Sequence, residues 1–134
     1  DPSLGRLYTK EFYGRVKQRM SKDGVLVTQS TSPYFARQAY WMIGATLESE
    51  FSWVKPYTVY VPSFGQWGFF MAGNIAQNKL PELKVSTRYL TSEVIPLLFI
   101  FDKDTSQVPA KINTLNNQIL VSEYDKGWEY VNIE

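Results

Sequence analysis

Gln29 is the residue best placed to bind a ligand, because it ends the short apolar run Val25-Leu26-Val27-Thr28. Such a run is typical of a strand that is buried on both faces of a parallel sheet. Ligands of open α/β sheets gather beyond the carboxyl ends of the strands, where the amide of Gln29 can both donate and accept hydrogen bonds. Gln29 is therefore a candidate binding residue, and the alternative is an amide that satisfies loop backbone.

A second candidate is the aromatic stretch 62–73, Pro-Ser-Phe-Gly-Gln-Trp-Gly-Phe-Phe-Met-Ala-Gly. Its first five residues predict a turn between two strands, and Gly65 and Gly68 supply backbone freedom where aromatic side chains crowd together. Phe64 and Trp67 would then form one wall of a site. Aromatic strands joined by such a turn also occur in α/β cores without any ligand, so core packing is the alternative.

The composition limits the chemistry that these residues can serve. The chain has no cysteine and no histidine, which excludes thiolate nucleophiles, disulfides, Cys/His zinc sites and the Ser-His-Asp triad. Any reaction must therefore use carboxylates, hydroxyls, amides or a bound co-substrate, and we expect no metal. Fourteen basic and thirteen acidic residues give a net charge of +1, so nothing favours nucleic acid or an anionic membrane as a partner.

The elements that must position these residues can be predicted in part. A chain of 134 residues with 44% hydrophobic content is one domain in size. Thr9 is a good N-cap for a helix over Lys10 to Met20, and Ser32-Pro33 predicts the start of a second helix that runs to Glu48. The second helix has a regular apolar stripe, which consists of Ala36, Ala39, Tyr40, Ile43 and Leu47.

Strands are predicted over Tyr57 to Val61, where flanking prolines favour a sheet edge, and over Trp67 to Ala72. The short connection makes this pair antiparallel. Near the end of the chain, Gln118 to Tyr124 and Trp128 to Ile133 predict a β-hairpin. The chain begins without methionine, so we expect it to be a piece of a longer protein.

These motifs together resemble a known family. They are Leu7-Tyr8 with Phe12-Tyr13, Asp23-Gly24-Val25-Leu26 leading into Gln29, and Pro62-Ser63-Phe64 with Gly68-Phe69. Residues 1–101 resemble the carboxyl-terminal half of the spermidine synthase, or polyamine aminopropyltransferase, family, and residues 102–134 are expected to form a carboxyl-terminal extension. The sequences of these motifs are most similar to those of a bacterial subgroup in which a membrane-spanning amino-terminal region precedes the synthase domain.

The resemblance implies an α/β fold, the carboxyl-terminal half of a doubly wound, class I methyltransferase-like (Rossmann-like) sheet with an antiparallel edge pair. It also implies a transferase of polyamine biosynthesis, which moves an aminopropyl group from decarboxylated S-adenosylmethionine to putrescine or a related amine. Gln29 matches the family's diamine-contacting glutamine, and Phe64 replaces a tyrosine of the diamine pocket. We expect Trp67 of this chain to add to the wall of that pocket. Leu4 and Leu7 fall in the loop that lines the adenine.

The family's catalytic Asp-x-x-Asp is expected just upstream of the first residue, and Asp1 matches the loop that follows this acidic pair better than the pair itself. No catalytic residue is therefore assigned, and the isolated chain is expected to be inactive. Its exposed sheet edge predicts a homo-oligomer. We expect a soluble cytoplasmic domain whose parent is anchored in the bacterial inner membrane. Two alternatives are a non-catalytic binding or scaffold domain and an S-adenosylmethionine-dependent methyltransferase-like domain.

Overall fold

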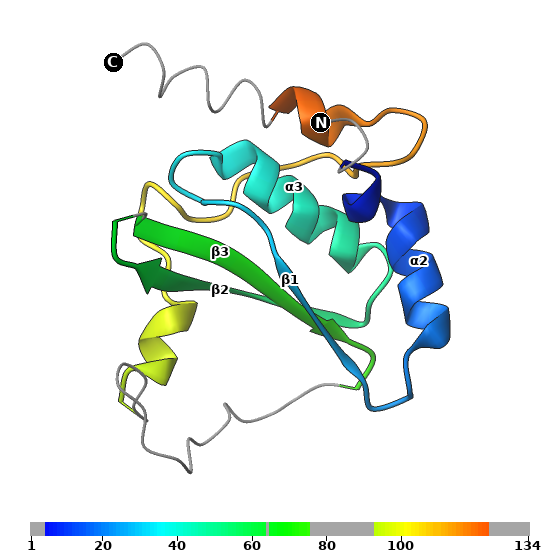
Figure 1. Ribbon diagram of the computed structural model, residues 1–134, viewed down its shortest axis with the longest axis horizontal. Helices are drawn as coiled ribbons and strands as arrows, with labels where there is room; N and C mark the ends of the chain where they lie inside the picture. Colours follow the sequence, from blue (N-terminus) through cyan, green and yellow to red (C-terminus); the bar gives the residue numbers. More distant parts are fainter. Residues whose placement is uncertain (1–4, 64, 76–92, 124–134) are drawn as a thin grey trace.

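The computed structural model describes residues 5–63, 65–75 and 93–123. Its centre is a three-stranded sheet made of β1 (Val25–Gln29), β2 (Trp53–Val61) and β3 (Gly65–Gly73) in the order β1-β3-β2. Both pairings are antiparallel. Among the described strands, this order makes β3 central and places β2 at an edge, as its prolines predict. Helix α3 (Arg37–Glu48) covers one face of the sheet, and the short 3-10 helix η2 (Ile95–Phe99) lies on the other side (Figure 1).

Alternation along β3 decides which face meets α3. Gly68, Phe70 and Ala72 are buried on one face, and the Phe70 ring stacks on Tyr40 of α3 with centroids 4.4 Å apart. At Gly44 of α3, an added Cβ would lie 2.8 Å from the Phe70 ring, so the helix and the sheet are in close contact. The predicted apolar stripe is confirmed: its residues, Ala36, Ala39, Tyr40, Ile43 and Leu47, are all buried.

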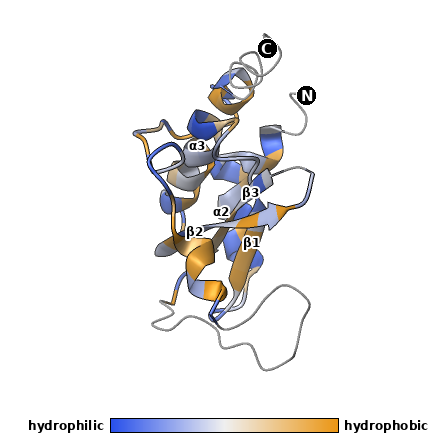
Figure 2. Cartoon of the chain, turned by 90° about the vertical axis from the view of Figure 1, so that its left-hand side faces the viewer, coloured by the Kyte–Doolittle hydropathy of each residue, from blue (hydrophilic) through white to orange (hydrophobic). Residues whose placement is uncertain are grey.

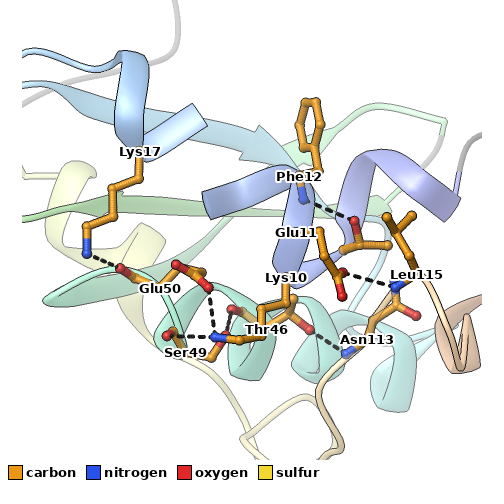
Figure 3. A network of polar contacts seen from close by, with 10 residues as sticks. Lys10, Glu11, Phe12, Lys17, Thr46, Ser49, Glu50, Asn113 and Leu115 are labelled. Carbon is orange, nitrogen blue, oxygen red and sulfur yellow. Dashed lines mark hydrogen bonds and ion pairs between the residues drawn. The ribbon is translucent and has the colours of Figure 1, made fainter. Parts of the chain in front are cut away.

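Helix α2 (Lys10–Arg19) packs beside α3 and carries the cap that the sequence predicts. The hydroxyl oxygen of Thr9 accepts a hydrogen bond from the Phe12 amide at 3.2 Å. Lys10 pairs with the Glu50 carboxylate at 2.7 Å, and the Lys17 ammonium donates to the Glu50 backbone oxygen at 2.7 Å (Figure 3). Two cations thus meet the carboxyl-terminal end of α3, where the helix dipole favours them.

Two predictions about the first half of the chain are wrong. Helix α3 begins at Arg37, because the Ser32 hydroxyl accepts from the Tyr34 and Phe35 amides and so caps a separate turn before the helix. Strand β1 is not buried on both faces, since Val25 is 42% and Val27 53% exposed. Among the described strands β1 pairs with β3 alone, and these two side chains point away from α3.

The predicted strand over Gln118 to Tyr124 is also wrong, because residues 119–123 are helical. A short apolar run fits either structure, and here a local hydrogen bond favours the helix. The side-chain oxygen Oδ1 of Asn117 accepts from the Ile119 amide at 3.1 Å, as a helix cap does. The second strand of that hairpin, Trp128 to Ile133, lies outside the described residues.

Candidate functional site

Gln29 lies at the end of β1 with its side chain exposed, directly opposite Phe69 of β3. The backbone amide of Ser30 donates to the Gly68 carbonyl at 2.8 Å. Successive residues of an antiparallel strand direct their backbone groups to opposite sides, so the Gln29 carbonyl points away from β3. There it accepts a hydrogen bond from the Tyr8 hydroxyl at 3.1 Å. Tyr8 therefore holds the backbone of Gln29 from the free side of the strand.

The chain turns sharply after Gln29. Thr31 has a φ of 67°, a left-handed conformation that is uncommon for a β-branched residue and is found disproportionately at functional sites. Its carbonyl accepts from the Gly68 amide at 2.7 Å, which fixes the turn against β3. Gly68 must be a glycine here, because an added Cβ would lie 2.3 Å from the Tyr40 ring. The turn leaves the amide of Gln29 at the end of the sheet.

The face of the sheet that points away from α3 carries a group of aromatic side chains, called here the aromatic wall. It consists of Tyr57, Trp67, Phe69 and Phe99. The rings of Tyr57 and Phe69 stack with centroids 5.2 Å apart, and Tyr57 and Phe99 lie 5.8 Å apart. Partial burial raises the pKa of Tyr57. Gln29 is on the same face as this wall, because it is the register partner of Phe69.

This arrangement suits an organic amine. Aromatic faces attract ammonium groups, and a glutamine amide oxygen accepts hydrogen bonds from them. The wall already holds one such group, since the Lys55 ammonium lies 4.4 Å from the centre of the Phe99 ring. The Glu50 carboxylate pairs with Lys10, and the Glu11 carboxylate accepts a hydrogen bond from the Leu115 amide. Both carboxylates therefore stabilise the fold, and neither is assigned to the amine site. The described groups can thus bind and orient an amine.

The structure brings together some of the predicted site residues. Gln29 lies opposite Phe69, and Trp67 lies two positions before Phe69 in β3, on the same face. Leu7 belongs to the 3-10 helix η1 (Arg6–Tyr8) and is 47% exposed, next to the tyrosine that bonds Gln29. Leu4 and Phe64 lie outside the described residues.

Sequence reasoning missed Tyr57 and Tyr8. Tyr57 could have been found from the register of the antiparallel pair, because closing the turn 62–66 places it opposite Phe69. Tyr8 was quoted only as part of a motif, and its bond to a residue 21 positions away has no local sequence signal.

A family model described as the spermine/spermidine synthase domain matches residues 2–85. The polyamine aminopropyltransferase of Leptospira interrogans is 42% identical over 129 residues, which are 96% of this chain and 26% of that protein. The enzyme of the same name from Oceanobacillus iheyensis is 44% identical over 132 residues, with 95% and 26% covered. The chain thus spans about a quarter of the length of these curated relatives.

Solved structures agree on the fold. A spermidine synthase in complex with the transition-state analogue AdoDATO superposes with a TM-score of 0.61 at 20% identity, covering 72% of this chain and 37% of that one. The spermidine synthase of Thermotoga maritima superposes with the same TM-score, and the alignment covers 36% of that synthase. The expected Rossmann-like, methyltransferase-type α/β fold is thereby confirmed. With a family model that matches well over half of its residues, this chain belongs to the spermine/spermidine synthase family.

Proposed function

We propose that the full-length protein transfers an aminopropyl group from decarboxylated S-adenosylmethionine to putrescine or a related diamine, and that this chain supplies one side of the diamine pocket. The observation that carries the proposal is the shared face of Gln29 and the aromatic wall at the end of β1. The name of the Leptospira interrogans relative, polyamine aminopropyltransferase, supports the same reaction.

In this reaction an unprotonated amine attacks the propyl carbon next to the sulfonium. The new C–N bond forms as the C–S bond breaks, its electrons return to sulfur as a neutral thioether, and the amine proton passes to a carboxylate base. Gln29 and the aromatic wall would hold the diamine in line for the attack, which is a large part of the catalysis of such a transfer. Phe64 and Trp67 would continue the pocket, and Leu4 and Leu7 would contact the adenine. The base would be a carboxylate of the acidic pair that the family resemblance implies in the full-length protein.

The test is an assay of the full-length protein with decarboxylated S-adenosylmethionine and a panel of diamines, with polyamine products separated by chromatography. We expect product from the full-length protein and none from the 134-residue chain. A parallel assay contains S-adenosylmethionine in place of the decarboxylated form, and methyl transfer there would support the methyltransferase-like alternative instead. No product from any of these substrates would support a scaffold role.

We also propose that the full-length protein carries a membrane-spanning region before its synthase domain. The matched segment is 26% of the Leptospira interrogans protein, whereas the aligned part is 37% of the solved synthase with AdoDATO. The curated relative is therefore longer than that synthase and has room for a further region. None of the helices in the described part of this chain combines the length and apolar character that a bilayer crossing needs.

The free edge of β1 leads to a prediction about association. The isolated chain is expected to self-associate through β1. Within the described residues this strand pairs on one side only, so its other side offers backbone donors and acceptors beside the exposed Val25 and Val27. Val27→Lys should yield a monomer by light scattering, since a charged side chain on an edge strand opposes pairing. Ser122→Lys adds the same charge to an exposed site in the terminal helical segment and should leave the oligomer intact. A wild-type chain that stays monomeric at high concentration would refute the prediction.

A further inference from the structure

Residues 102–123 follow the side of α3 that faces away from the sheet (Figure 1). The Trp41 indole donates to the Thr105 carbonyl at 2.8 Å, and the Arg37 guanidinium donates to the Ser106 carbonyl at 2.9 Å. The Gln38 amide donates to the Pro109 carbonyl at 2.9 Å. These bonds attach the first part of the extension to α3 without reaching the site. Figure 2, turned by 90° from Figure 1, shows the hydrophobic helix η2 on the other side of the sheet from α3.

Further along, Asn113 is completely buried and joins three parts of the fold. Its backbone amide donates to the Thr46 hydroxyl of α3 at 2.9 Å (Figure 3), and its backbone carbonyl accepts from the Lys10 amide of α2 at 2.9 Å. Its side-chain oxygen accepts from the Leu120 amide at 3.1 Å. Every polar group of this residue has a partner, as a buried amide requires.

The side-chain NH₂ group of Asn113 makes the contact that matters for the site. It donates to the Tyr8 carbonyl at 3.1 Å and to the Gly5 carbonyl at 3.4 Å, so it fixes both ends of the segment that contains η1. The hydroxyl of the same Tyr8 donates to the backbone of Gln29. Asn113 and Gln29 are therefore connected through one residue, although they are far apart in sequence.

We propose that Asn113 is a positioning residue for the amine-binding site. It holds η1 in place, so that Tyr8 fixes the backbone of Gln29. The extension is then a working part of the site. This inference rests on the proposed function for its kinetic test, whereas the connection between Asn113 and Gln29 can be tested without any turnover.

The kinetic test compares Asn113→Ala and Arg37→Ala in the full-length protein. Asn113→Ala should raise KM for the diamine about tenfold with a smaller change in kcat, as expected when a binding contact is misplaced. Arg37→Ala removes three hydrogen bonds between α3 and the extension, and these go to Ser106 and Lys103 rather than to the segment that contains η1. Its diamine KM should stay near the wild-type value even if stability falls. An equal rise of KM in both variants would overturn the proposal.

Tyr8→Phe keeps the fold testable if Asn113→Ala does not accumulate, because it removes only the hydroxyl that reaches Gln29. It should also raise the diamine KM. Where Asn113→Ala does accumulate, the double variant should be no worse than the stronger single one, since both changes cut the same connection. Additive effects would overturn the proposal.

Hydrogen exchange separates this inference from the proposed function. If the wild-type protein makes no polyamine from any diamine, the proposed function fails, and exchange at backbone amides 25–31 still tests the connection. Asn113→Ala should speed exchange there more than Arg37→Ala does. Equal exchange in the two variants would count against the role assigned to Asn113.

Discussion

Replacing Gln29 by alanine in the full-length protein is expected to lower kcat/KM for the diamine about 100-fold, because a bond from an amide to a charged amine is lost in the pocket. The fold should not suffer. The side chain is exposed, and the contacts that hold this position use its backbone, through Tyr8 and the register with Phe69. The measurement is steady-state kinetics with varied diamine, together with the denaturant midpoint of each variant.

Gln66→Ala is the matched control. Gln66 is also an exposed glutamine at the end of a strand, but it lies on the opposite face of β3 from Trp67 and Phe69. Its replacement should leave kcat/KM within about twofold of wild type, as for a surface change away from the site. If Gln29→Ala keeps most of its activity, the amide merely satisfies loop backbone, and the diamine pocket must lie elsewhere.

The parts of the fold that sequence predicts are those with a local cause. The apolar stripe of α3 repeats at helical spacing, and Thr9 carries its own capping hydroxyl, so both could be recognised without the structure. The antiparallel pair β2–β3 follows from the short turn between its strands. By contrast, the exposure of Val27 depends on which strands flank β1. The residue types from Val25 to Gln29 do not predict those neighbouring strands.

The site is predictable to the same extent. Gln29 was chosen as a candidate because the end of a strand is a recurrent place for ligands, and Trp67 because it belongs to an aromatic stretch with two glycines. Asn113 was not found, since a lone asparagine in a polar segment predicts only a loop. Its importance comes from bonds to the backbone of Gly5 and Tyr8, more than 100 positions away, which no local pattern records.

Gly68→Ala is expected to cost about 3 kcal/mol of folding free energy, the upper part of the range for overpacking a core. The new Cβ would lie 2.3 and 2.6 Å from two atoms of the Tyr40 ring and 2.7 Å from the Thr31 carbonyl oxygen. That ring cannot easily move away. It is fully buried, stacks on Phe70, and its hydroxyl donates to the Phe69 carbonyl at 2.8 Å. Burial also raises the pKa of Tyr40, so the hydroxyl keeps the proton that it donates.

Gly65→Ala separates this effect from the general cost of replacing a glycine in β3. Gly65 has a φ of 83° and no atom within 4 Å of an added Cβ, so only backbone strain of about 1 kcal/mol is expected there. Denaturant unfolding of the two variants measures the difference. Because the Gly68 amide holds the Thr31 turn, the surviving folded Gly68→Ala protein should also misplace Gln29 and turn over diamine more slowly. Equal stability of the two variants would mean that the Tyr40 ring moves away from the new Cβ at little cost. The close contact of α3 with β3 would then not fix the end of β1.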